Sequence, residues 1–173
     1  MSGHTASTMI VDRENVERAF AWRKVPRSVL RGSLELPFLS TDEKDALWFQ
    51  SRDWRDLTWD HWNDYFRGIF FLTAEALAYY MPSIILFSTE KRKERMLAAE
   101  SLLMQLQEGI SCASDESEVT SDSVHLTKAE CEVLAGWLQG LCSSPAYETG
   151  VNRARIDAAL AILGVGEQPE AEE

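Results

Sequence analysis

Cysteine and histidine are scarce in this chain, with three residues of each type among 173. Cys112, Cys131 and Cys142 are an odd number, and their spacing fits neither a disulfide framework nor a zinc site. Cys131 and Cys142 lie eleven residues apart on one predicted helix, which separates them by roughly 16 Å, whereas a disulfide needs Cα atoms within ~7 Å. We therefore expect small buried apolar cysteines in a reducing cytoplasm.

Recognisable catalytic motifs are also missing. His4, His61 and His125 are isolated from one another, and none belongs to a Ser/His/Asp or Cys/His arrangement. The segment 164–166 (GVG) follows a predicted helix, whereas a phosphate-binding loop opens into the N-terminus of a helix. The sequence therefore predicts a protein that is not an enzyme and that holds no metal and no cofactor.

The chain has one long apolar stretch, at 69–87, and its first residues lack the basic region of a secretion signal. The first ten residues have no basic region followed by an apolar core, so a secretion signal is not expected. The apolar stretch is long enough to cross a bilayer, but it contains Glu75 and Pro82. A carboxylate costs up to ~3.5 kcal/mol near the centre of a spanning helix, and proline interrupts helical hydrogen bonds. We expect no membrane span, but a buried hairpin of two short helices that meet at Pro82.

Positively charged residues are fewer than negatively charged ones: the chain has 17 Lys and Arg and 28 Asp and Glu, for a net charge of −11. The acidic residues flank a nearly neutral middle region. Such a surface repels nucleic-acid phosphates and anionic lipid headgroups, and it speeds association with basic proteins. Solubility alone is an alternative reason for the acidic balance.

Helix-start signals are abundant, whereas the alternating pattern of a β-strand is nearly absent. Residues that can cap a helix N-terminus precede five helical patterns; they are Asp12, Ser40, Thr58, Thr73 and Thr127. Glu43 and Glu130 stand three residues after Ser40 and Thr127, which is the spacing of a capping box. Helices are therefore predicted to begin at these five positions.

These patterns predict an all-α protein, a single-domain bundle of about six to seven helices over residues 11–165. The longest helix should span 90–108, with Ser88 or Thr89 at its start. Residues 1–10 should form a flexible N-terminus, 111–123 a mobile acidic loop, and 166–173 a disordered acidic tail.

The most distinctive segment interleaves tryptophans with aspartates over residues 53–65, and a structural interpretation comes first. Trp59, Trp62, Phe66 and Phe70 recur at helical spacing. They predict one apolar stripe that faces the core, with the aspartates on the solvated face.

A second interpretation of the same segment is chemical. Asp60 and Asp64 stand four residues apart with His61 beside them, as in a metal site or a proton-transfer site. A divalent site usually takes ligands from further elements, and no matching His or Glu pair on a second helix is evident. A metal-dependent enzyme or sensor is therefore the alternative hypothesis.

A third interpretation is a recognition surface. Trp and Tyr act as anchors in protein interfaces, and Asp accepts charge-assisted hydrogen bonds from Arg or Lys. The residues expected to bind a partner are Asp53, Trp54, Asp56, Asp60, Asp64 and Tyr65, together with Asp115, Glu116 and Glu118 of the acidic loop.

A small basic group follows the first predicted helix, and it consists of Arg23, Lys24, Arg27 and Arg31. Together with Phe20 and Trp22 this group could contact an anion or an acidic partner. Its small size favours an ordinary solvated helix end.

Three segments together resemble an uncharacterised family of small bacterial proteins. They are WRDLTWDHWNDYF, FLTAEALAYYMPSIILFS and LTKAECEVLAGWLQGL. The family pattern FL-S/T-x-E-A-x-x-Y-Y-L-P is matched from Phe71 to Pro82, with Met81 in place of Leu, and Cys131 stands where a later family helix usually has Gln. The resemblance covers roughly 48–141 and implies a helical cytoplasmic protein without an assigned reaction.

We therefore expect a non-enzymatic, acidic protein-binding module in the cytoplasm, with no nucleic-acid or membrane partner. By analogy of size and charge, it is similar to bacterial immunity or antitoxin proteins, which neutralise a partner toxin by masking a basic surface. A structural subunit that forms a homodimer is a further alternative.

Overall fold

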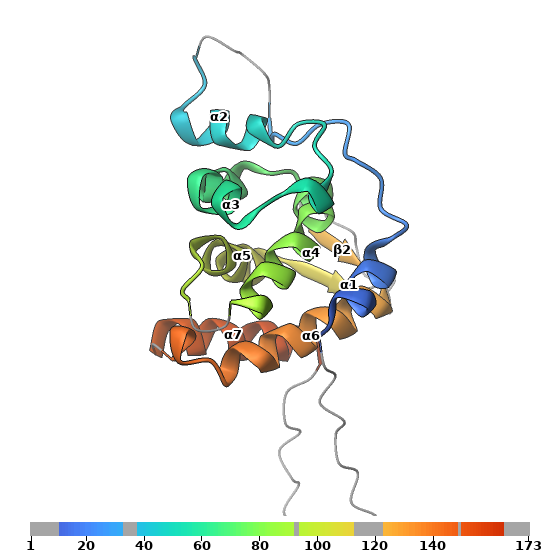
Figure 1. Cartoon of the computed structure of the whole chain (residues 1–173), viewed down its shortest axis with the longest axis vertical. Coiled ribbons are helices and arrows are strands. Elements are labelled where there is room, and N and C mark those ends of the chain that lie inside the picture. The colour runs from blue at the N-terminus through green and yellow to red at the C-terminus, as the bar shows by residue number, and fades with distance from the viewer. Residues whose placement is uncertain (1–10, 33–37, 92–93, 113–122, 149, 165–173) are drawn as a thin grey trace, which may run out of the picture.

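Seven α-helices make up most of the chain within the residues that the computed structural model describes, which are 11–32, 38–91, 94–112, 123–148 and 150–164. The helices are α1 (Arg13–Phe20), α2 (Thr41–Trp48), α3 (Trp59–Tyr65), α4 (Ala74–Glu90), α5 (Leu97–Glu108), α6 (Lys128–Cys142) and α7 (Gly150–Ile162). Three short 3₁₀ helices are η2 (Trp54–Asp56), η3 (Phe66–Phe71) and η4 (Pro145–Tyr147). Figure 1 shows α2 above α3, then α4 and α5, and then α6 beside α7. The predicted all-α, single-domain bundle of six to seven helices is confirmed.

The helix starts follow the local capping signals. The Asp12 carboxylate accepts a hydrogen bond from the Asn15 N–H at 2.8 Å. Ser40 and Glu43 form a reciprocal capping box, in which the Glu43 N–H donates to the serine hydroxyl and the Ser40 N–H donates to the glutamate. Thr58 and Thr127 form capping boxes at the starts of α3 and α6, and the Thr73 hydroxyl accepts the Ala76 N–H at the start of α4. All five predicted caps are confirmed.

Helix α4 passes through Pro82 without a break, so the predicted hairpin of two short helices is wrong. Proline inside a helix costs about 3 kcal/mol, because it lacks an N–H and its ring crowds the preceding turn. Residues 76–86 are all buried, and burial of one Leu or Ile side chain stabilises a fold by about 1.5–3 kcal/mol. Packing of the whole helix in the core therefore outweighs the local effect of one proline. None of the described helices combines the length and the apolarity that crossing a membrane requires.

The predicted helix over 90–108 is also wrong, because α4 ends at Glu90 and α5 begins at Leu97. Lys91 leaves the helical region, with φ −109° and ψ 47°. Met96 is fully buried in an extended conformation, and its N–H donates to the hydroxyl of the buried Tyr147 at 3.2 Å. This long-range hydrogen bond holds the segment that enters α5.

Two short parallel strands lie beside α4, although the sequence shows almost no strand pattern. Strands β1 (Ile110–Cys112) and β2 (Val124–Leu126) pair in register, with Ile110 opposite Val124. Val124 and Leu126 are buried, and the side chain between them is exposed. Strand β1 corrects the first part of the predicted loop over 111–123, and residues 113–122 of that loop lie outside the described residues. The predicted N-terminal segment 1–10 and the tail 166–173 also lie outside them.

A buried ion pair joins the segment after α1 to the start of α6. Arg23 donates through Nε and Nη2 to the Glu130 carboxylate at 2.5 and 2.8 Å, and its Nη2 also donates to the His125 carbonyl at 2.7 Å. The side chains of Arg23 and Glu130 are 9% and 0% exposed. The expectation that this basic group is solvated is therefore wrong for Arg23, whereas Lys24, Arg27 and Arg31 are exposed.

The predicted aromatic stripe is only partly correct. Helix α3 ends at Tyr65 and the chain continues as η3, so the helical spacing does not extend to Phe66 and Phe70. Of the four aromatic residues, Trp62 alone is fully buried, and its indole N–H donates to the Ser83 hydroxyl of α4 at 2.9 Å. A tertiary hydrogen bond therefore orients α3 against α4.

Gly68 allows η3 to lie directly against α2. A Cβ atom at this position would lie 2.5 Å from the Ala46 nitrogen and 2.7 Å from the Asp45 carbonyl carbon. Both neighbours are backbone atoms, which cannot move aside as a flexible side chain does. Any residue larger than glycine therefore forces these two elements apart.

The cysteines differ from one another. Cys142 is a half-buried free thiol, and desolvation raises its pKa. Cys131 is disulfide-bonded, so the expectation that it is a buried thiol is wrong. Disulfides persist mainly in oxidising compartments, and the cytoplasmic location stays a prediction.

Candidate functional site

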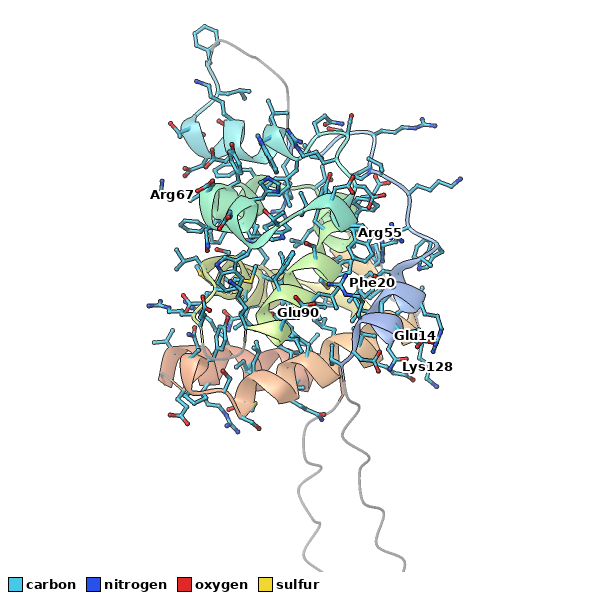
Figure 2. The ribbon with its side chains drawn as sticks, viewed as in Figure 1. Glu14, Phe20, Arg55, Arg67, Glu90 and Lys128 are labelled. Atoms are coloured by element: carbon cyan, nitrogen blue, oxygen red, sulfur yellow. The ribbon has the colours of Figure 1, made fainter. Side chains whose placement is uncertain are left out.

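The aspartate-rich segment folds around a surface cleft of about 220 Å³, formed where α2, η2 and α3 meet. The Asp53 carboxylate begins η2 by accepting the Arg55 N–H at 2.9 Å, and Thr58 begins α3. In Figure 2, Arg55 of η2 and Arg67 of η3 lie on opposite sides of the molecule at about the level of α3. The residues that line the cleft are Trp48, Ser51, Arg52, Asp53, Asp56, Leu57 and His61.

One wall of the cleft is aromatic. The Trp48 ring stacks on Tyr65 with centroids 4.2 Å apart and an angle of 12° between the planes. The Arg52 guanidinium lies 3.8 Å from the Trp48 ring centroid. Two groups this close would overlap on one face of the indole, so Arg52 and Tyr65 cover opposite faces. The stack places a cation on an aromatic surface in the cleft, which is a favourable arrangement.

The turn beneath this wall is held by a buried tyrosine of α4. The Tyr80 hydroxyl lies 2.5 Å from the Phe49 carbonyl and 3.1 Å from the Arg52 carbonyl, and it donates to this pair of acceptors. Desolvation raises the pKa of Tyr80 far above its ordinary value. The hydroxyl therefore stays protonated and fixes the backbone that carries Arg52.

Ser51 lines the same cleft in the left-handed backbone region, at φ 65°. It is the one non-glycine residue with positive φ in the part of the chain that the structure describes. Such a conformation is costly for a residue with a Cβ, and strained residues concentrate at functional sites. The turn between α2 and η2 is therefore rigid and strained.

The predicted carboxylates differ in their availability. Asp53 is paired with Arg55 through an exposed 3.3 Å contact. Asp56, Asp60 and Asp64 are exposed, and within the described chain their carboxylates form no hydrogen bond or ion pair. Asp56 lines the cleft, whereas Asp60 and Asp64 lie one turn apart on the exposed face of α3. The structure therefore presents three unpaired carboxylates on and beside the cleft.

His61 serves the local fold instead of forming a cluster with the aspartates. Its Nδ1 accepts the Thr58 N–H at 3.1 Å in a capping box, and its ring lies 4.8 Å from the Trp48 ring. Nowhere in the described ranges do three His, Cys, Asp or Glu side chains converge as metal ligands. Asp60, His61 and Asp64 are therefore not brought together as the metal hypothesis requires.

The aromatic residues expected to contact a partner also differ. Trp54 is 2% exposed and belongs to the core, which corrects its expected role as a surface anchor. Tyr65 is half-buried in the stack on Trp48. The predicted contact residues Asp115, Glu116 and Glu118 lie outside the described residues.

The sequence did not single out Trp48, Ser51 or Arg52 as site residues. The pair Trp48 and Arg52, four residues apart, is a weak signal for a cation on an aromatic ring. The left-handed turn at Ser51 has no sequence signal, since glycine or asparagine is usual there.

No protein-family model, curated protein or solved structure matches the chain. The case for a function therefore depends on the geometry of the cleft and on the surface charge.

Proposed function

We propose that the protein is a non-enzymatic, acidic binding module that uses the cleft between α2, η2 and α3 to recognise a basic surface of a partner protein. The proposed partner is a bacterial toxin, which the module inhibits by masking that surface. The toxin part of the proposal depends on the family resemblance and on the size and charge of the chain. Nucleic acid and membrane are not expected partners of so acidic a surface.

The three unpaired carboxylates carry this proposal. Asp56, Asp60 and Asp64 are exposed and have no cationic neighbour that satisfies them. A carboxylate that is free in the monomer needs no internal ion pair to be broken before it accepts hydrogen bonds from a partner's Arg or Lys. Exposed internal pairs such as Arg18 with Glu14 lack this advantage.

The aromatic wall adds an anchor next to these charges. Trp48 is half-buried and its stack on Tyr65 limits its motion. A rigid aromatic side chain loses little conformational entropy on binding, which is why tryptophan is common among the residues that dominate interface energies. The cleft therefore combines a fixed, half-buried aromatic side chain with neighbouring carboxylates.

A differential pull-down from the native host tests the proposal. The bait is the full chain, and the test variant carries Asp56→Asn, Asp60→Asn and Asp64→Asn. A control with the same change in charge carries Glu94→Gln, Glu132→Gln and Glu148→Gln, which are exposed positions outside the cleft. Mass spectrometry and densitometry measure the identity and the stoichiometry of the captured protein.

We expect a stoichiometric basic protein with the wild-type and control baits and its loss with the test variant. Equal capture by all three baits, or no stoichiometric partner, contradicts the proposal. Capture of a second copy of the chain itself indicates the homodimer alternative. For the toxin part, co-expression of the captured protein should be harmful to cells without this chain and harmless with it.

A further inference from the structure

A second cavity lies next to η2, and its polar lining residues all carry hydrogen-bond donors. Its volume is about 50 Å³, and it is enclosed by the start of α1, by η2 and by α4. Arg13, Trp54, Arg55 and Ser83 contribute its polar lining, and Leu57 and Phe87 are among its apolar walls. We refer to this cavity as the donor pocket.

The indole N–H of Trp54 is the distinctive group in the donor pocket. Trp54 is 2% exposed, and its Nε1 is the one buried side-chain nitrogen or oxygen without a hydrogen-bond partner in the described chain. The hydroxyl of Ser83 already accepts the N–H of Trp62 at 2.9 Å. Buried donors in native proteins are nearly always paired, so an unpaired one indicates a place for an acceptor.

Two arginine side chains line the same pocket as Trp54. Arg13 pairs with Glu90 at 2.8 Å and with Glu17 at 3.5 Å, and Arg55 pairs with Asp53 at 3.3 Å. These pairs are solvent-exposed, with 57% and 42% of the two arginine side chains accessible. Exposed ion pairs are weak, so either arginine can exchange its partner for a better-placed acceptor.

Arg55 also forms the outer wall of the donor pocket. Its guanidinium lies 4.4 Å from the Trp54 ring centroid and covers the indole. Figure 2 labels Arg55 and Glu90, the partner of Arg13, in the central part of the molecule. A change of side-chain conformation would let the N–H donors of Arg55 face an acceptor in the pocket.

We propose that the donor pocket binds a carboxylate group, which accepts hydrogen bonds from the Trp54 indole and from the guanidinium groups of Arg13 and Arg55. The planar carboxylate matches the guanidinium fork. Its apolar stem would lie against Leu57 and Phe87. A phosphate fits less well, because its additional oxygens would face these apolar walls. The carboxylate belongs either to a small organic acid or to an Asp or Glu side chain of a protein, and this inference does not depend on the proposed function.

Nuclear magnetic resonance of the ¹⁵N-labelled full chain tests this inference. The indole N–H resonance of Trp54 is followed during titrations with sodium acetate, with a short capped peptide that contains one glutamate, and with inorganic phosphate, all at constant ionic strength. We expect acetate or the peptide to move the Trp54 resonance downfield in a saturable manner. The Trp137 indole, which donates to Ser88 at 2.8 Å, is the internal control and should not move.

Substitutions test whether Arg13 and Arg55 bind the carboxylate. Arg13→Gln and Arg55→Gln should each weaken carboxylate binding by about tenfold or more, since a hydrogen bond to a charged group is lost. Arg18→Gln is the matched control, because Arg18 lies on the same helix, is exposed and pairs with Glu14. It should leave the affinity unchanged.

The titrations distinguish the two sources of the carboxylate and can also refute the inference. Saturable binding of acetate identifies a small organic acid as a sufficient ligand, and binding of the peptide alone identifies an acidic protein side chain; both support the inference. An unmoved Trp54 resonance in both carboxylate titrations overturns it, and this result needs no variant. Tighter binding of phosphate than of acetate, or equal effects of Arg18→Gln and Arg13→Gln, also overturns it.

Discussion

Replacement of Arg23 by methionine should destabilise the protein strongly. Arg23 is the only cation that the structure places on the Glu130 carboxylate within the described residues, and it contributes both bonds at 2.5 and 2.8 Å. Methionine keeps the apolar stem but removes the charge and the five donors. The carboxylate, at 0% exposure, would then be buried without a counter-ion.

The expected loss is about 3–5 kcal/mol, which is typical when one partner of a buried ion pair is removed. Exposed pairs contribute roughly 0–1 kcal/mol, so Arg18→Met, which removes an exposed pair with Glu14 and an exposed hydrogen bond to Asn15, should change the free energy of unfolding by about 0.5 kcal/mol or less. A loss of 3–5 kcal/mol is a large part of the stability of about 5–15 kcal/mol that domains usually have. It should lower Tm by about 6–20 °C.

The double variant Arg23→Met with Glu130→Gln distinguishes the effect of the buried charge of Glu130 from the effect of its hydrogen bond in the capping box. The Glu130 carboxylate also accepts the Thr127 N–H at 2.7 Å, and a glutamine at the third position of a capping box can do the same. The double variant should therefore recover most of the lost stability. Urea unfolding monitored by circular dichroism measures all three variants. If Arg23→Met costs no more than Arg18→Met, or if the double variant is no more stable than the single one, this reasoning is refuted.

Four further predictions concern backbone positions and buried tyrosines. Ser51→Gly should raise the free energy of unfolding by about 1 kcal/mol, because glycine adopts the left-handed conformation without steric cost. A lower Tm of this variant in thermal denaturation would contradict this expectation. Gly68→Ala should lower the free energy of unfolding by about 3 kcal/mol, since the new methyl group meets the backbone of α2. Gly32→Ala is the control: its Cβ would have open space, so only the smaller cost of a positive φ of 87° is expected. Tyr80→Phe should cost about 1–2 kcal/mol through the loss of a buried hydrogen bond. Desolvation raises the pKa values of Tyr79, Tyr80 and Tyr147, so the stability they contribute is fully present below pH ~10 and is lost as the pH rises above it; unchanged stability at high pH would be evidence against this burial.

The sequence predicted the features of this fold that depend on neighbouring residues. A helix cap is a hydrogen bond between residues three positions apart, so Asp12, Ser40 and Thr73 could be identified from composition and spacing alone. The same locality explains why the number of helices was correct.

Features that depend on distant residues were missed. Pro82 is helical because the core surrounds α4, and α5 starts where it does because Tyr147 holds Met96. Arg23 reads as a surface residue until Glu130, 107 positions later, is placed against it. None of these contacts leaves a periodic pattern in the sequence.

The candidate site shows the same division. The sequence located the acidic segment, and Asp56, Asp60 and Asp64 are exposed on or beside the cleft. It could not distinguish a buried tryptophan from an exposed one, so Trp54 was assigned to the surface while Trp48 was overlooked. Apolar residues occur on more than one face of the segment 53–65, and tertiary packing alone determines which of them are buried.

The salt dependence of association tests the central claim most directly. For the captured partner, stopped-flow kinetics should give an association rate constant that falls by about tenfold or more from low to high ionic strength. The variant with Asp56→Asn, Asp60→Asn and Asp64→Asn should associate more slowly at low salt and show a shallower dependence, while the Glu94, Glu132 and Glu148 control keeps the wild-type slope. An association rate that is insensitive to salt, or equal slopes for all three proteins, would contradict recognition of a basic surface by these carboxylates.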